Sequence, residues 1–432
     1  MPNGLTSGPR IFTKLMKPVL AFLRKLEIIL AIYIDDIINI HRSLKACGEN
    51  TQTIIQTLKR LGFIINTGKS IKTPSKMMEF LGFEINSEQM TIKLTMDKKK
   101  VILEMCENIL SLQSVKIRTV AKLIGKFTSS FVGVMYGPLH YRYLEHDKVT
   151  ALKFNKGNFN KTMSISEKGK IDIIWWKENI LGSYNHIGIG NPSPNMILTT
   201  DASNSGWGGT VLGQATHGFW SSDEKQLHIN VLELKAICFS LVSLIPQLSD
   251  IHLMVMCDNT TAVHTITNMG TCRSLGCHDV VMEIWQWAID NRNWITATHI
   301  PGVENCEADS LSRSQEISCE WMLNVDIFNS ILTHFDIIPD IDLFASRLNR
   351  QIDTFVSYVP DPEAMHVNAF TLDWSQYVFY CFPPFACIGR IIRKIINDKA
   401  RGILITPDWP TQYWYPLLLD ISDVLPFILF SG

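Results

Sequence analysis

Residues 196–212 read MILTTDASNSGWGGTVL, and the rest of the chain is organised around this stretch. An apolar run ends in Asp201, a turn of Ser, Asn and Gly follows, and residues 207–212 resume a strand pattern, which predicts a β-hairpin. An acid at the end of a strand is held on a rigid scaffold and can ligate a metal ion. For this stretch alone, an ordinary aspartate at a strand end is an equally good interpretation.

Three later acids favour the metal interpretation. Glu233 lies in NVLELKAICFSLVSL, which has helical apolar spacing, Asp258 follows the apolar run IHLMVMC, and Asp309 lies in HIPGVENCEADSLSR near a final predicted helix. Four carboxylates on such elements can converge on two divalent cations, which together promote an in-line displacement at phosphorus. Hard oxygen ligands suit Mg²⁺, two per site, with Mn²⁺ as an alternative ion.

The motifs TDAS, ELKAI, CDN and HIPG…N…AD occur in the order found in ribonuclease H, and the segment resembles the retroelement form of that family. The resemblance implies a mixed sheet flanked by helices over residues 196–315. It implies that Asp201, Glu233, Asp258 and Asp309 are the catalytic metal ligands, and it places Asn305 at the family's asparagine.

The same resemblance implies a binding partner for the chain, and it implies a role for His299. The partner is an RNA–DNA hybrid or another nucleic acid duplex, and contacts to 2′ hydroxyls would select the RNA strand. His299 corresponds to a mobile histidine that aids product release or proton transfer, although a histidine ending a strand is usually structural. Residues that follow metal ligands on loops are candidates for the hydroxyl contacts: Asn204, Ser205, Asn259 and Thr260.

Composition indicates a globular protein of several domains. The chain has 432 residues, of which 46% are hydrophobic, which excludes a disordered protein. Residues 1–150 carry 22 Lys and Arg against 12 Asp and Glu, whereas the whole chain carries 40 against 41. This basic first third favours a phosphate-backbone partner, and a solvated basic face is the alternative.

Cysteine spacing and apolar runs bear on the compartment. The ten cysteines include no CxxC pair, which argues against zinc and disulfide frameworks. The first residues, MPNGLTSGPR, lack an apolar signal region, and no apolar run reaches the length of a membrane helix. We expect no membrane partner and an intracellular protein, cytoplasmic or nuclear or both, that is not secreted.

Residues 28–40 read IILAIYIDDIINI and predict two strands around Asp35 and Asp36. Burying paired carboxylates in a hairpin is costly unless a metal neutralises them. An ordinary polar hairpin turn is the alternative. YIDD resembles the YxDD motif of reverse transcriptases, and three neighbouring motifs agree with it: PNGLTSGPRIFTKL, LGF followed by Lys69, and FLG of a primer-grip hairpin.

The reverse transcriptase resemblance implies a partial palm over residues 1–90, with Asp35 and Asp36 as catalytic metal ligands. It implies nucleic acid or nucleotide contacts by Tyr33, Gly4 and Lys69. The family needs a third aspartate on an earlier strand, and this sequence begins after that strand and after the fingers. We therefore expect that the chain alone does not polymerise DNA.

Residues 91–195 resemble the thumb and connection of the same family. Residues 97–113 and 117–131 predict amphipathic helices, a further helix is predicted over 161–181, and 182–195 is rich in Gly, Asn, Ser and Pro, as in a linker. Lys122 and Lys126 on the second helix are candidates for contacts to a duplex. The aromatic residues nearby are expected to be core rather than stacking platforms.

Residues 316–432 predict an α/β module from three strands and a helix over 388–398. DLFAS and FPPF resemble motifs of adenine-specific DNA methyltransferases. Phe382 stands where that family needs Asp or Asn to accept a hydrogen bond, and Ser346 replaces the expected glycine. We expect a structural or nucleic-acid-contacting module without transferase activity.

The order of these parts resembles the polyprotein of DIRS-type retrotransposons, and other proteins of the element are candidate partners. The predicted fold class is a multidomain α/β and α+β protein: partial palm and thumb, ribonuclease H-like mixed sheet, and C-terminal α/β module. The predicted activity is ribonuclease H, an endonuclease. The alternative is a catalytically silent, nucleic-acid-binding remnant of a retrotransposon.

Overall fold

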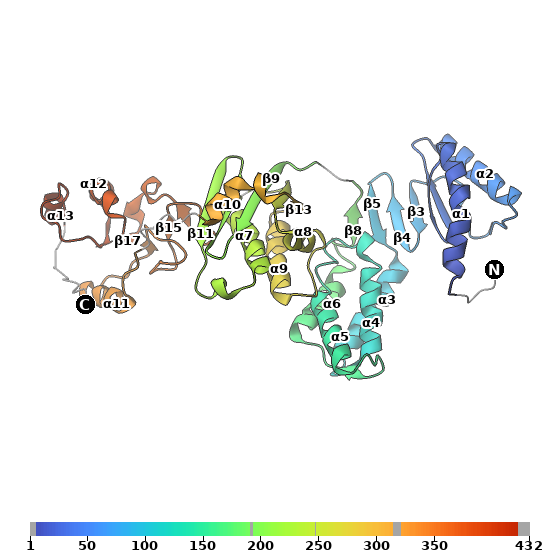
Figure 1. The fold of residues 1–432 in the computed structure, drawn as a ribbon, viewed down its shortest axis with the longest axis horizontal. Helices are drawn as coiled ribbons and strands as arrows, with labels where there is room; N and C mark the ends of the chain where they lie inside the picture. Colours follow the sequence, from blue (N-terminus) through green and yellow to red (C-terminus); the bar gives the residue numbers. More distant parts are fainter. Residues whose placement is uncertain (1–5, 191–192, 247, 314–320, 422–432) are drawn as a thin grey trace. The chain divides into compact units, whose positions relative to one another are not determined.

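The computed structural model describes residues 6–190, 193–246, 248–313 and 321–421, and it is a mixed α/β structure (Figure 1). The chain divides into two compact units, Met1–Asn191 and Pro192–Gly432. Within the described ranges, every helix is too short or too polar to cross a membrane. The finer division into four domains stays a prediction.

The first unit begins with a hairpin between two helices: α1 (Gly8–Lys25), β1 (Ile29–Tyr33), β2 (Asp36–Ile40) and α2 (Leu44–Arg60). Pro9 lies in the first turn of α1, where its missing N–H breaks no helical hydrogen bond. Apolar residues of both helices and of the hairpin form one core: Met16, Leu23, Ile28, Leu30, Ile54 and Leu58.

A four-stranded antiparallel sheet follows, in the order β3-β4-β5-β8. Its strands are Met77–Phe80, Phe83–Asn86, Thr91–Leu94 and His186–Gly188. The expected hairpin at FLG is present as β3 and β4. The segment 182–195, expected to be a linker, instead contributes β8, because three residues are too few to show an alternating pattern in the sequence.

Four helices complete this unit. They are α3 (Met96–Leu110), α4 (Ile117–Thr128), α5 (Arg142–Phe154) and α6 (Glu167–Asn179), with the short strands Val115–Lys116 and Thr162–Met163 (β6, β7) pairing between them. The helices predicted from the sequence are present but end earlier than expected. Their core holds Trp176 stacked on Phe127, with ring centroids 4.3 Å apart. These aromatic residues are thus core, as expected.

The second unit is built on a five-stranded mixed sheet in the order β11-β10-β9-β12-β13. β9 is antiparallel to β10 and parallel to β12, and β12 is parallel to β13. The five strands are Met196–Ala202 (β9), Gly206–Val211 (β10), Gln214–Phe219 (β11), His252–Cys257 (β12) and Trp294–His299 (β13). This is the mixed sheet that the sequence predicted.

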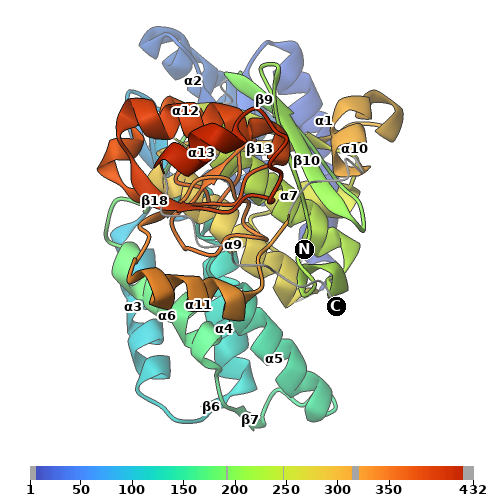
Figure 2. The same cartoon turned by 90° about the vertical axis from the view of Figure 1, so that its left-hand side faces the viewer.

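Two adjacent glycines on β10 allow close approach of α7 (Ile229–Leu244) and α10 (Cys306–Arg313) to the sheet. A Cβ at Gly208 would meet Leu311 of α10, and a Cβ at Gly209 would meet Ser240 of α7. Figure 2 shows α10 beside β10. The bare backbone lets both helices approach closely. The helices of this part are Ile229–Leu244 (α7), Thr260–Thr267 (α8), Leu275–Asp290 (α9) and Cys306–Arg313 (α10).

The C-terminal part is a small parallel sheet with helices. Its three strands, in the order β14-β17-β18, are Ile341–Asp342, Val378–Cys381 and Arg401–Leu404. Its helices are Val325–Phe335 (α11), Ile388–Asp398 (α12) and Tyr415–Ile421 (α13), and Val356–Ser357 (β15) pairs with His366–Val367 (β16). The α/β module predicted from the sequence is present, and α11 and α13 were not predicted.

Candidate metal and nucleic acid site

Three acids meet at one edge of the five-stranded sheet. Asp201 lies near the end of β9, Glu233 near the start of α7, and Asp258 directly after β12. One carboxylate oxygen from each lies within 4.8 Å of the other two. β9 and β12 are parallel neighbours, so their carboxyl ends share an edge, and α7 packs on β9.

Burial and mutual repulsion disfavour the charged forms of Asp201 and Glu233. The side chains of Asp201 and Glu233 are buried. Burial, together with the charges of Asp201 and Asp258, raises the pKa of Glu233 to about 8. Burial also raises the pKa of Asp201, although a hydrogen bond from Ser312 opposes the shift.

The donor set fits a divalent cation. Glu233 Oε2 is buried and accepts no hydrogen bond from the described residues. A cation bound among three carboxylates would neutralise their charge and take up this oxygen. All ligands would be hard oxygen atoms, as Mg²⁺ prefers.

Asp309, the fourth predicted ligand, does not join this group. It lies in the first turn of α10, and Nε of Arg313 lies 2.6 Å from its Oδ1. The charge of Asp309 still contributes to the raised pKa of Asp201, so the residue borders the site. The sequence predicted convergence of four acids, and the structure brings three together, while the fourth is paired with Arg313.

Two neutral residues of the loop and helix after β13 support the acid on β9. Ser312 Oγ donates a hydrogen bond to Asp201 Oδ2 at 2.6 Å, and Asn305 Nδ2 donates to the carbonyl of Thr200 at 2.9 Å. The sequence had singled out Asn305 and missed Ser312. The spacing of three residues from Asp309, on the same face of α10, was the available signal.

His299 and Asn259 have different surroundings. His299 ends β13 and is exposed. The turn after it lies close to the acids, since a Cβ on Gly302 would approach Asp258 Oδ2 to 3.1 Å.

Asn259 caps α8, donates to Asn230 and hydrogen-bonds Glu233. The structure therefore gives Asn259 partners inside the protein, whereas it was expected to contact nucleic acid.

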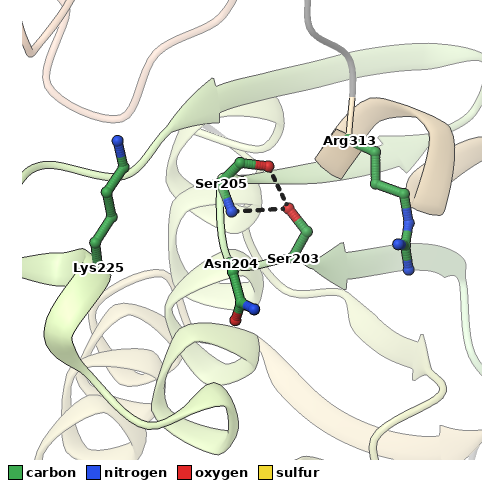
Figure 3. Close-up of a pocket in the computed structure, with 5 residues that line it drawn as sticks. All are labelled: Ser203, Asn204, Ser205, Lys225 and Arg313. Atoms are coloured by element: carbon green, nitrogen blue, oxygen red, sulfur yellow. Dashed lines mark hydrogen bonds between the residues drawn. The ribbon is translucent and has the colours of Figure 1, made fainter.

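A pocket of about 570 Å³ lies beside the turn that follows Asp201. Ser203 and Ser205 bond to each other in this turn, and Figure 3 shows Lys225 and Arg313 on opposite sides of it, with Asn204 between them. Hydroxyl, amide and cationic groups in one pocket suit a phosphate and sugar backbone. The sequence had singled out Asn204 and Ser205 but neither cation.

The hairpin around YIDD departs from expectation. Asp35 and Asp36 were expected to be buried and neutralised, but both are exposed, as is Tyr33. The two-residue turn places them at the tip of a two-stranded sheet, where water solvates them. Ile34 has a φ of 53°, which is strained for a β-branched residue. No third acid joins the pair to form a metal-ligand group in the described part of the chain.

The lysines predicted to contact nucleic acid in the first unit lie on its surface. Gly4 lies outside the described residues, and Lys69, Lys122 and Lys126 are exposed. The sequence missed Lys98, whose Nζ donates to the carbonyl of Leu81 at 2.8 Å. Burial and the neighbouring charge of Lys126 lower the pKa of Lys98.

Residues of the two methyltransferase-like motifs have partners within the C-terminal module. Phe382 packs with α11 residues, and Ser346 donates its backbone N–H to Asn349 at 2.7 Å. Asp342 on β14 is buried, which raises its pKa to about 6, and it accepts the backbone N–H of Gln351. The carboxyl group of Asp342 is therefore hydrogen-bonded within the C-terminal module.

Comparison with known proteins finds relatives for part of the chain. Residues 1–85 match the family of reverse transcriptase (RNA-dependent DNA polymerase), as YIDD predicted. The enzymatic polyprotein of Figwort mosaic virus (strain DxS) is 26% identical over 332 residues, covering 72% of this chain. This chain spans 45% of that polyprotein. The two matches support a retroelement reverse transcriptase.

Solved structures give weaker similarities. The foamy viral protease-reverse transcriptase in complex with RNA/DNA hybrid is 15% identical with a TM-score of 0.37, over 75% of this chain and 42% of that chain. RNase H1 from the halophilic archaeon Halobacterium salinarum NRC-1 is 14% identical with a TM-score of 0.23, over 27% of this chain and 92% of that chain.

Proposed function

We propose that residues 196–315 form a ribonuclease H that hydrolyses the RNA strand of RNA–DNA hybrids, within a fragment of a retroelement polyprotein. The observation that carries the proposal is the convergence of Asp201, Glu233 and Asp258 on one edge of a mixed sheet. The DIRS-type order of domains, with a thumb over 91–195 and an inactive methyltransferase-like module over 316–432, belongs to the same proposal.

The residues of the site would have different roles in the reaction. Two divalent cations, Mg²⁺ or Mn²⁺, would supply an activated water and stabilise the departing 3′ oxygen. Asp201, Glu233 and Asp258 would hold them, and Ser312 orients Asp201. Asp309 would complete the ligand set by leaving Arg313, and both side chains are partly exposed to solvent.

Binding would use groups beside the acids. The pocket with Lys225 and Arg313 would accept the backbone of a hybrid, and Asn204 and Ser205 would meet 2′ hydroxyls. His299, exposed at the end of β13, would assist proton transfer or product release. In contrast, no third acid among the described residues forms a metal-ligand group with the exposed Asp35 and Asp36, so we propose that this chain alone does not extend primers.

One observation favours a second candidate, a silent nucleic-acid-binding remnant. Asp309 is held by Arg313 and stands outside the group of three acids. If this ion pair persists when a hybrid binds, the second cation lacks a ligand. The chain would then bind nucleic acid without cutting it.

Cleavage of a labelled RNA–DNA hybrid by the full chain in Mg²⁺ tests the proposal. Asp258→Asn removes the negative charge of one ligand. Asp290→Asn on α9 is the matched control, since it removes a charge away from the site and Asn keeps the oxygen that accepts from Gln286. We expect metal-dependent cutting of the RNA strand, lost in the first variant and kept in the second. Hybrid binding without cutting by the wild type would favour the silent remnant.

A further inference from the structure

The polar face of α12 lines a pocket in the C-terminal part, away from the acids of the ribonuclease-like site in sequence. Its volume is about 230 Å³, and its lining residues are Phe370, Arg390, Arg393, Lys394, Asn397 and Asp398. The opposite face of the helix is buried through Ile388, Ile391 and Ile392. The helix therefore turns its cationic side chains toward the pocket.

The acids near this pocket are already engaged. Asp398 accepts from Lys394 Nζ at 2.6 Å and from the backbone N–H of Trp374 at 3.0 Å. Asp373, which also lies near Lys394, accepts from Ser375 at 2.7 Å. Within the described part of the chain, neither Arg390 nor Arg393 forms an ion pair with an acid, so the pocket keeps two uncompensated positive charges.

Arg390 is held in place by an aromatic ring. Its guanidinium carbon lies 3.7 Å from the centroid of Phe370, whose ring packs against the core of the module. Attraction to the ring restricts the guanidinium while leaving N–H groups available. A planar donor fork with a fixed orientation is suited to two parallel hydrogen bonds with a phosphate.

The volume of the pocket indicates how large a phosphate-containing ligand it can hold. A volume of 230 Å³ is below the roughly 300–1,000 Å³ of pockets that enclose a whole small-molecule ligand. It is nevertheless several times the roughly 30 Å³ that one water occupies in the liquid. The space suits a single phosphate group with part of its substituent outside.

We propose that Arg390, Arg393 and Asn397 form a phosphate-binding site on α12. The ligand is one phosphate group, either a free phosphate or a phosphodiester of a nucleic acid strand that passes over the helix. Phe370 positions Arg390, and Asp398 holds Lys394 beside the site. This site is separate from the metal-binding acids and does not depend on ribonuclease activity.

Hydrogen exchange of the full chain, measured by mass spectrometry in EDTA, tests the site while metal-dependent cleavage is switched off. The ligands are inorganic phosphate, adenosine monophosphate and a twelve-residue oligothymidylate, each in turn. The variant is R390Q/R393Q. The control is Arg350→Gln in the same module, where the arginine is already paired with Glu363.

We expect slower exchange in peptides from residues 369–398 of the wild type and the control, and no change in the double variant. Protection by inorganic phosphate identifies a single-anion site, and protection by the oligonucleotide alone identifies a strand-binding site. For the oligonucleotide, Arg393→Gln should lower the slope of log affinity against log salt by about 1. No protection by any ligand, or equal protection in the double variant, would overturn the proposal.

Discussion

Arg347 and Glu224 form a buried ion pair that joins the C-terminal part to the five-stranded sheet. Arg347 Nη2 lies 2.7 Å from Glu224 Oε2, and the two side chains are 7% and 12% exposed. The same nitrogen donates to the carbonyl of Phe219 on β11, and the guanidinium lies over the ring of Phe239 on α7. The pair therefore links the module of residues 321–421 to the helix that carries Glu233.

Arg347→Ala should destabilise the second unit by about 3 kcal/mol, because it leaves the carboxylate of Glu224 buried with Lys235 as its remaining cationic partner. The measurement is urea unfolding of the full chain followed by tryptophan fluorescence. Arg350→Ala is the control, with a cost of about 1 kcal/mol or less, since its pair with Glu363 is more exposed. Equal losses in the two variants would contradict the linking role.

Ser312→Ala should weaken metal binding. Removing the hydrogen bond to Asp201 withdraws a group that lowers the pKa of this acid, so the pKa rises further and the charged, metal-binding form becomes less favourable. A hydrogen bond to a charged group contributes about 1.5–3 kcal/mol to the stability of the state that holds the charge. Isothermal titration with Mn²⁺ measures the effect, and Ser310→Ala, at an exposed position of α10, should leave the affinity unchanged.

The stability of the first unit should fall as the pH rises from about 4 to about 8. Burial raises the pKa of Asp172 to about 8, and its carboxyl group accepts the backbone N–H of Leu144 at the start of α5. Because the folded state holds this proton and the unfolded state releases it near pH 4, folding is favoured at low pH.

Asp172→Asn should flatten this pH dependence, since Asn imitates the protonated carboxyl group. Urea midpoints at pH 5 and pH 8 measure it, with the exposed Asp97→Asn as control. If the variant and the wild type lost the same stability between these two pH values, Asp172 would not be the group that titrates.

Glu233→Gln should stabilise the second unit without metal and remove its response to metal. Above pH 8 Glu233 of the wild type is charged beside the other two acids, and Gln removes this charge. With Mg²⁺ at a hundredfold excess over Kd, the wild type should gain about 2.7 kcal/mol and the variant much less. Thermal unfolding at pH 9 in EDTA and in Mg²⁺ measures both effects. Glu283→Gln, exposed on α9, should behave as wild type.

The sequence predicted the mixed sheet of the second unit and helix α12, because their signals are local, but it did not predict α11 and α13. The bounds expected for α12, residues 388–398, agree with the structure, since apolar periodicity specifies them. It missed β8, whose three residues form a strand only because β5 lies beside them. Long-range pairing leaves no local signal in so short a segment.

The sequence by itself determined which acids stand at strand ends and helix starts, because residue order and element periodicity fix those positions. Only the tertiary structure decided which of them meet. Asp201, Glu233 and Asp258 lie close together in the structure. Asp309 forms an ion pair with Arg313. Asp35 and Asp36 are exposed to solvent. Which acids meet depends on contacts between residues far apart in the chain. It also depends on whether an acid pairs with a nearby cation, as Asp309 does with Arg313. A local sequence pattern specifies neither.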